Sequence, residues 1–173
     1  MKPIENKENN YLLTIAIPTY NRSKYLDLCL AQICKQLPGN EQFVELIVSD
    51  NNSADSSEEV VKKYIAQGCD IRYIKNKENI GAAGNVFQCY QQAKGKYLLI
   101  LGDDDIFSDG SINSIINILK EKDYCIAYLK QCAHKNNSTH TSRNYTPFNN
   151  IREFIKKTHY GLTFISGNIV NKS

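Results

Sequence analysis

Residues 12–22 read LLTIAIPTYNR, and this stretch sets the fold class. Its first six residues form a continuous apolar, β-prone run, which is typical of a strand that is covered on both faces of its sheet. Pro18 closes the run and polar residues follow it. A strand of this kind is expected in an α/β fold, because parallel sheets are covered by helices on both faces.

The same alternation continues along the chain. Short apolar runs predict further strands at 43–48, 71–74, 97–101 and 124–129. Between them, apolar residues three and four apart predict helices at 23–37, 56–68, 82–94 and 111–121. Ser23 and Ser56 stand where side chains commonly cap a helix. Four successive β-α units predict an α/β fold with a mainly parallel sheet and right-handed crossovers.

Composition divides the chain into three regions. The first ten residues are polar and are expected to be a flexible terminus, 1–10. The β-α units fill residues 11–132. Residues 133–173 begin as a polar loop rich in Asn, Ser, Thr and His, followed by a short basic helix pattern at 151–158 and a strand pattern at 162–165.

Composition also excludes several classes of protein. A hydrophobic fraction of 42% and a charged fraction of 23% in 173 residues exclude a disordered chain. The net charge of +3 is scattered, so we expect no nucleic acid partner. No apolar run approaches the ~18 residues of a membrane span, and no signal peptide is visible, so a cytoplasmic location is expected. In that compartment, six cysteines without a Cys-x-x-Cys motif predict reduced, mostly buried thiols.

Four polar segments follow four of the predicted strands, at 18–22, 49–55, 76–85 and 102–105. In an open parallel sheet, ligands bind beyond the carboxyl ends of the strands. We therefore expect the four segments to converge on one rim of the sheet and to form the binding site.

The last of these segments contains Asp103, Asp104 and Asp105. Three adjacent carboxylates beyond a buried strand are costly unless a positive group joins them. A divalent metal ion would do this, and oxygen ligands select Mg²⁺ or Mn²⁺. The alternative is a solvated acidic turn that caps the next helix. For Asp50, a hydrogen bond to a ribose or base and a local Asx-turn both remain open.

Other nucleotide-binding signatures do not match. Gly81 and Gly84 lack the Gly-x-Gly-x-x-Gly spacing of a dinucleotide-binding domain, and no Walker A sequence occurs. A nucleotidyltransferase would need a Gly- and Arg-rich loop after the first strand, and residues 18–22 contain no glycine.

Taken together, the motifs resemble those of a known family. They are IAIPTYNR at 15–22, VSDNNSAD at 48–55, NIGAAGN at 79–85 and the acidic triplet. In this order and spacing, over about residues 11 to 130, the chain resembles a family 2 glycosyltransferase with the GT-A fold, of the type that builds bacterial surface polysaccharides. The resemblance implies a single Rossmann-like nucleotide-sugar-binding domain, with a mainly parallel sheet flanked by helices.

The resemblance also implies an activity and its partners. A sugar would pass from a nucleotide-diphosphate donor, a UDP-sugar, to a cell-surface glycan or lipid-linked glycan acceptor. The reaction would depend on Mn²⁺ or Mg²⁺ and invert the anomeric configuration. The basic, amphipathic stretch 151–157 leaves peripheral contact with the inner face of the membrane open. The sugar, the linkage and the oligomeric state are not fixed by the sequence.

Residue by residue, the resemblance places nucleotide contacts at Pro18, Thr19, Tyr20, Arg22, Gly81 and Asn85. Asp50 would bond the base, which is usually uracil in this family. Asp104 is favoured as the metal ligand, with Asp103 beside the ribose and Asp105 as a second ligand or orienting group. The register of the triplet against the family's Asp-x-Asp motif stays open, because Gly102 takes the first place.

The C-terminal part departs from the family pattern. Inverting members use an acidic base on the acceptor side, and after Asp123 the only acid is Glu153, which has no motif around it. The catalytic base is therefore unassigned, and we expect a chain truncated within an incomplete acceptor region. The alternative function is a truncated, non-catalytic nucleotide-sugar-binding or interaction module.

Overall fold

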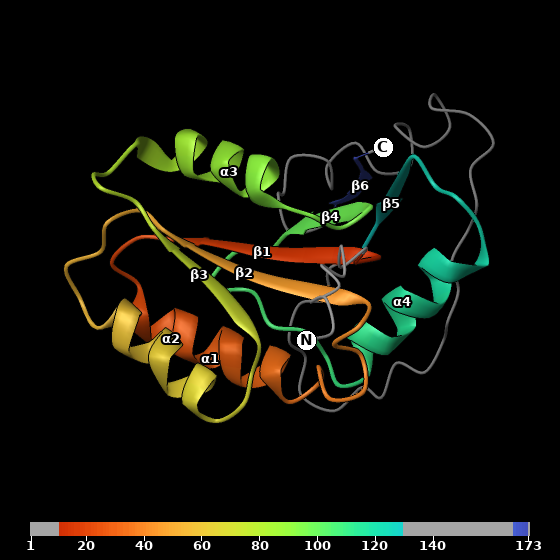
Figure 1. Cartoon of the computed structure of the whole chain (residues 1–173), viewed down its shortest axis with the longest axis horizontal. Helices are drawn as coiled ribbons and strands as arrows, with labels where there is room; N and C mark the ends of the chain where they lie inside the picture. Colours follow the sequence, from red (N-terminus) through yellow and green to blue (C-terminus); the bar gives the residue numbers. More distant parts are fainter. Residues whose placement is uncertain (1–10, 130–167, 173) are drawn as a thin grey trace, which may run out of the picture.

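The structure is a computed structural model that describes residues 11–129 and 168–172 (Figure 1). Its elements are β1 (Leu13–Thr19), α1 (Ser23–Cys34), β2 (Val44–Asp50), α2 (Ser57–Ala66), β3 (Ile71–Lys75), α3 (Gly81–Gln92), β4 (Tyr97–Ile100), α4 (Ser111–Glu121), β5 (Ile126–Tyr128) and β6 (Asn168–Asn171). The alternation of strands and helices confirms the predicted α/β class.

The six strands form one sheet in the order β3-β2-β1-β4-β6-β5. β1 lies at the centre and pairs in parallel with β2 and β4, while β2 pairs in parallel with β3. β6 is antiparallel to both of its neighbours, β4 and β5. The carboxyl ends of the four parallel strands therefore meet at one edge of the sheet.

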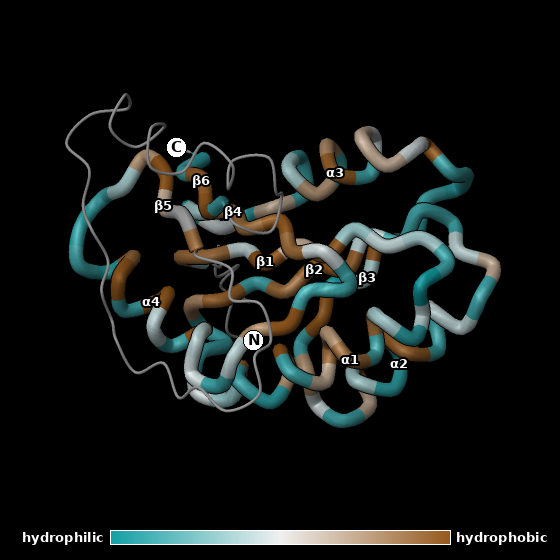
Figure 2. Tube along the Cα trace, turned by 180° about the vertical axis from the view of Figure 1, so that it is seen from behind, coloured by the Kyte–Doolittle hydropathy of each residue, from teal (hydrophilic) through white to brown (hydrophobic). Residues whose placement is uncertain are grey.

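Helices cover both faces of the sheet. α1, α2 and α4 share the larger hydrophobic cluster with Ile15, Ile17 and Leu46, whereas α3 packs on the other face over Ala16, Ile47 and Leu98. Figure 1 shows α3 on one side of β1, and α1 and α2 on the other. Figure 2 shows the hydrophobic colouring concentrated in the central strands. Successive residues of β1 thus enter opposite clusters, which explains its unbroken apolar run.

Both N-terminal strands extend further than predicted. β1 includes Pro18 and Thr19, and β2 includes Ser49 and Asp50, because the parallel ladder continues through Pro18↔Ser49 and Thr19↔Asp50. The first two residues of two polar segments of the predicted site therefore belong to the sheet itself.

The expected side-chain caps at Ser23 and Ser56 are wrong. The N-cap positions of α1 and α2 are Arg22 and Ser56, and neither makes a side-chain cap hydrogen bond. Instead, Asp55 serves both helices: its Oδ2 accepts from the Ser23 amide at 2.8 Å, and its Oδ1 accepts from the amide and hydroxyl of Ser57. Burial raises the pKa of Asp55, but these hydrogen bonds outweigh it and lower the pKa overall. One carboxylate therefore fixes the amino ends of two helices.

β6 is absent from the sequence-based predictions. Its four residues include only two strongly apolar ones, Ile169 and Val170, which is too short a run to stand out. Ile169 pairs with Leu99 on one side and with Ala127 on the other, so β6 is defined by its neighbours. The predicted helix at 151–158 and strand at 162–165 lie outside the described residues, and the proposed region 133–173 stays a prediction.

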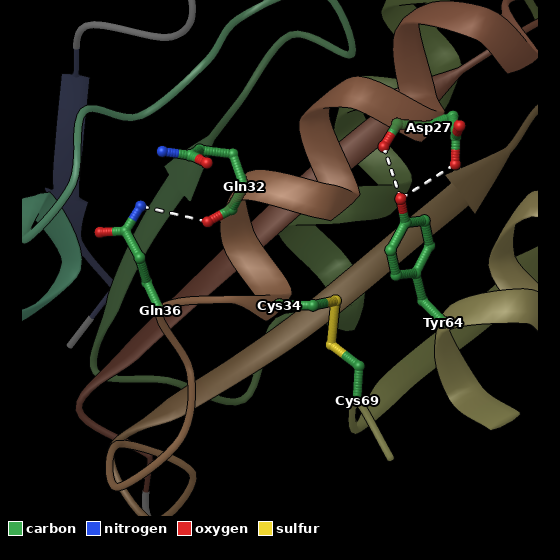
Figure 3. The surroundings of a disulfide bond; sticks show 6 residues. All are labelled: Asp27, Gln32, Cys34, Gln36, Tyr64 and Cys69. Atoms are coloured by element: carbon green, nitrogen blue, oxygen red, sulfur yellow. Dashed lines mark hydrogen bonds between the residues drawn. A yellow bond between two sulfur atoms is a disulfide. The ribbon is translucent and has the colours of Figure 1, made fainter. Parts of the chain in front are cut away.

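A disulfide joins Cys34, the last residue of α1, to Cys69, which follows α2 (Figure 3). Their Cα atoms are 5.7 Å apart. The expectation that the thiols are reduced is wrong for this pair, because the fold brings two positions 35 residues apart together. Cys29 and Cys89 are free and buried, and burial raises the pKa of their thiols to about 12 and about 11.

Within residues 11–129 and 168–172, no helix is both long and apolar enough to cross a bilayer.

Candidate functional site

The polar segments do converge where β1 to β4 end, as the sequence predicts. The amide of Asn51 donates to the Thr19 carbonyl at 2.9 Å, and the amide of Asn76 donates to the Asp50 carbonyl at 2.8 Å. Across the next strand pair, Thr19 Oγ1 donates to Asp103 Oδ2 at 2.8 Å. The segments after all four parallel strands are thus hydrogen-bonded to one another.

Asp103 is the buried member of the acidic triplet, with 5% of the residue exposed. Its Oδ2 accepts the Thr19 hydroxyl, and its Oδ1 lies 3.1 Å from Arg22 Nε. Burial raises the pKa of Asp103, and the Thr19 hydrogen bond and the Arg22 charge offset part of that rise. The carboxylate is therefore held in place by two groups from the β1–α1 connection.

Arg22 also reaches the second carboxylate of the triplet. Its Nη2 lies 2.7 Å from Asp104 Oδ2, and its guanidinium carbon lies 4.6 Å from the centre of the Tyr25 ring. The sequence predicts a metal ion as the positive group that joins the three acids. In the structure, the Arg22 guanidinium contacts two of these acids, Asp103 and Asp104, and the metal site stays a prediction. The alternative is that the acidic triplet caps the next helix. This alternative does not hold, because that helix, α4, begins only at Ser111.

The carboxylates of this site suit a metal ion that also takes ligands from water or substrate. Among the described residues, no group of three or more His, Cys, Asp and Glu side chains comes together to hold an ion. Mg²⁺ and similar ions are commonly held by one or two carboxylates, with waters and substrate phosphates completing the shell. Asp104, whose side chain is 52% exposed, and the adjacent Asp105 could supply carboxylate oxygens of this kind.

Asp50 does not face open solvent in this structure, since it is fully buried. Its Oδ1 accepts from the Ser53 amide at 2.8 Å, and its Oδ2 accepts from the Tyr73 hydroxyl at 2.5 Å. Burial, together with the Asp50 charge, raises the pKa of Tyr73. The local turn contact that the sequence left open is present. Tyr73 pairs with Val48, two residues before Asp50, so both side chains lie on the same face of the sheet.

A cluster of asparagine side chains, buried except for Asn79, ties the third polar segment to the second. Asn51 Nδ2 donates to Asn79 Oδ1 at 2.7 Å, while Asn51 Oδ1 accepts from Asn76 Nδ2 and the Ile80 amide. Asn85 Oδ1 accepts the Ser49 hydroxyl at 2.6 Å, and Asn85 Nδ2 donates to the Ser49 carbonyl.

These contacts anchor the start of α3 to the end of β2. Asn85 is 3% exposed and connects the two elements. Gly81, with a φ of +77°, donates its amide to Asn79 Oδ1. Asn51, Asn76 and Asn79 lie in the polar segments that the sequence predicts for the site, but the sequence assigns no individual contact to them.

The remaining predicted residues lie at the β1 end. Pro18 is half-buried within β1. Tyr20, the first residue after β1, is 44% exposed. The next residue, Asn21, has a left-handed backbone with φ +54°. Its amide donates to Ser53 Oγ and its Oδ1 accepts from the Ala54 amide, which locks the β1–α1 and β2–α2 connections together.

The site therefore has two linked parts. One consists of Thr19, Arg22, Asp103 and Asp104. The other is the buried network of Asp50, Tyr73 and the amide cluster. The hydrogen bond from the Asn51 amide to the Thr19 carbonyl connects them.

Comparison with known proteins gives a consistent result. The profile described as Glycosyl transferase family 2 matches residues 14–171. The chain is 32% identical over 112 residues to the glycosyltransferase GlyG of Streptococcus pneumoniae, covering 65% of this chain and 36% of that protein. It is 34% identical over 102 residues to the abequosyltransferase RfbV of Salmonella typhimurium, covering 58% of this chain and 30% of that protein.

Solved structures share the fold. The crystal structure of S. aureus TarS 1-349 matches with a TM-score of 0.70 and 20% identity, covering 92% of this chain and 46% of that one. This likeness confirms the predicted GT-A-like fold. The chain spans about a third of the length of the curated relatives it matches.

Proposed function

We propose that this chain, which belongs to glycosyl transferase family 2, binds the diphosphate of a nucleotide-sugar donor at the rim of its sheet, where the parallel strands end. The observation that carries the proposal is the position of Asp103, which Thr19 and Arg22 hold at the carboxyl ends of the parallel strands. Ligands of open α/β sheets bind at this edge. With an acceptor bound beside this site, the sugar would be transferred to a bacterial surface glycan.

Structures of similar fold support the choice of ligand. S. aureus TarS 1-349 has been solved in complex with UDP and with UDP-GlcNAc, and the mannosyltransferase PcManGT in complex with GDP-Man and Mn²⁺. We propose a nucleotide diphosphate sugar for this chain, with UDP as the nucleotide. Pro18 and Tyr20 would approach it from the end of β1, and Gly81 from the start of α3.

In the proposed complex, the residues of the rim have different roles. Asp104, and Asp105 beside it, would hold Mn²⁺ or Mg²⁺, which when bound neutralises the charge of the leaving diphosphate. Thr19 keeps the buried Asp103 in position next to them. The role of Asp50 at the base stays a prediction. A carboxylate oxygen can accept two hydrogen bonds, so the Tyr73 hydroxyl does not exhaust it, but a base could reach this fully buried group only if a neighbouring side chain moved.

The test is a thermal shift with UDP, and with GDP in parallel, in Mn²⁺ and in EDTA. UDP should raise the midpoint of unfolding in Mn²⁺ and have little effect in EDTA, because the cation joins the diphosphate to the carboxylates. Asp104→Asn should remove most of the shift. Asp109→Asn is the matched control, since Asp109 pairs on the surface with Lys35 and Gln32. Equal shifts in Mn²⁺ and EDTA would contradict the metal-bridged site.

The second candidate is a nucleotide-sugar-binding module without turnover. It is favoured by the described residues, in which no side chain is assigned as a catalytic base. Sugar transfer, inversion and a cytoplasmic location stay predictions. Assay of this chain with a UDP-sugar and lipid-linked acceptors separates the two candidates: binding without release of UDP would favour the module.

A further inference from the structure

We propose that Arg22 is an internal counter-cation of the acidic triplet, which opposes binding of a divalent metal ion until a nucleotide diphosphate is present to pair with it. The inference rests on the proposed function and adds a positioning residue to it. Arg22 would make metal binding depend on nucleotide.

The first support is geometry. Arg22 uses two different nitrogen atoms on two consecutive carboxylates: Nε lies 3.1 Å from Asp103 Oδ1, and Nη2 lies 2.7 Å from Asp104 Oδ2. A planar guanidinium is suited to spanning two oxygen acceptors in this way. One carboxylate oxygen of Asp104, Oδ2, is thus already in contact with a positive group.

The second support is charge. The triplet carries three formal negative charges, and Arg22 supplies one positive charge to it. A metal ion that bound Asp104 would sit beside the guanidinium, and like charges at such short range repel. In the absence of nucleotide, the ion must therefore displace the arginine or bind against its repulsion.

The third support is the way in which Arg22 is held. Its carbonyl accepts from the amides of Tyr25 and Leu26 at 3.0 Å, which fixes its backbone at the amino end of α1. Its side chain, 42% exposed, rests on the Tyr25 ring. The guanidinium can therefore change partners while its backbone stays in place.

A diphosphate offers Arg22 a better partner than Asp104. Arginine pairs well with phosphate oxygens through two parallel hydrogen bonds. Transfer of Nη2 from Asp104 to the diphosphate would release that carboxylate for the metal. Each ligand would then favour the other, which is positive coupling between the two sites.

A purely structural role explains the contact poorly. The Arg22–Asp104 pair is roughly half exposed on both sides, and ion pairs of this kind contribute little to the stability of a fold. Asp103 also accepts the Thr19 hydroxyl, so Arg22 is not its only partner.

The experiment measures Mn²⁺ binding by the electron paramagnetic resonance signal of the free ion, first with protein alone and then with saturating UDP. Arg22→Gln removes the charge. It should bind Mn²⁺ alone about fivefold more tightly than the native protein, the scale expected from loss of one half-exposed charge interaction. The gain in Mn²⁺ affinity on adding UDP should shrink by about the same factor.

Three further variants make the result interpretable. Lys35→Gln removes a positive charge from the other end of α1, where Lys35 pairs with Asp109, and should leave Mn²⁺ affinity unchanged. Arg22→Lys keeps the charge and should stay near the native affinity, so a gain as large as that of Arg22→Gln would overturn the proposal. Asp104→Asn should lose Mn²⁺ binding with UDP present.

The outcomes distinguish the two proposals. If Arg22→Gln folds and binds Mn²⁺ no more tightly than the native protein, while Asp104→Asn loses binding, the role of Arg22 is overturned and the metal site stands. If the native protein binds no Mn²⁺ even with UDP, the metal site fails, and the role of Arg22 fails with it.

Discussion

Thr19 and Asp103 are joined by a 2.8 Å hydrogen bond across 84 positions of the sequence, and both side chains are almost fully buried. Thr19 ends β1, and Asp103 follows β4, which is the parallel neighbour of β1. The contact therefore closes the centre of the rim and holds the first acid of the triplet inside the protein.

Thr19→Val should destabilise the fold by about 1–3 kcal/mol, because it leaves a buried carboxylate with one donor fewer. Urea denaturation measures the loss. Thr19→Ser keeps the hydroxyl and should stay close to the native stability. Equal stability of the Val and Ser variants would show that the hydrogen bond contributes nothing.

Asn51→Ala should cost about 2–3 kcal/mol of unfolding free energy, because Asn76, Asn79 and the Ile80 amide lose a buried partner together. The neighbouring Asn52→Gly is the control. Asn52 has a φ of +65°, which glycine adopts readily, so this change should stay within about 1 kcal/mol of the native protein. A larger loss in Asn52→Gly than in Asn51→Ala would contradict the assigned network.

Loss of the disulfide should destabilise the protein by about 4 kcal/mol, the value that the chain-entropy relation gives for a loop of about 35 residues. Cys34→Ser, Cys69→Ser and the double variant should therefore unfold at the same, lower urea concentration. Dithiothreitol should lower the midpoint of the native protein to that value. Cys125→Ser, at an exposed free cysteine, should leave the midpoint unchanged. Full insensitivity of the native protein to dithiothreitol would count against the bond.

The contact between α1 and α2 should give the protein a measurable acid sensitivity. Asp27 pairs with Lys63. It also accepts the Tyr64 hydroxyl, as Figure 3 shows. The hydrogen bond from Lys63, partly offset by burial, lowers the pKa of Asp27. A lowered folded-state pKa stabilises the fold above the unfolded-state value, about 3.9, and this contribution is lost as the pH falls through the folded-state pKa.

The native protein should therefore exceed Asp27→Asn in thermal midpoint at pH 5 to 7, and the difference should shrink as the pH falls below about 4. Because the pair is about 40% exposed, 1 M salt should reduce the difference at neutral pH. A difference that stays constant from pH 7 to pH 2 would rule out the charge as its source.

Most of the fold is predictable from sequence because it depends on local hydropathy. β1, β2 and the apolar stripe of α4 are each encoded within a dozen residues, and all lie close to their predicted positions. β6 and the disulfide depend on partners far along the chain. Neither has a local signal, so neither could be predicted.

The site follows the same division. Its location, and the presence of Thr19 and Asp103 in it, follow from strand ends in a parallel sheet. The local sequence does not show which side chain pairs with which carboxylate. Arg22 and Tyr73 reach their carboxylates only because neighbouring strands set the register. Asp55 likewise caps α1 from another connection.

The position of β6 has a consequence for synthesis. In the described sheet, β5 joins the other strands only through β6, and about 40 residues separate the two in sequence. At ~5–20 residues per second, a ribosome takes about 2 to 8 s to make that stretch. During this interval β1 to β4 can already be assembled, and β4 is a temporary sheet edge with unpaired backbone groups. A nascent chain thus passes through a period in which a competing strand could take the place of β6.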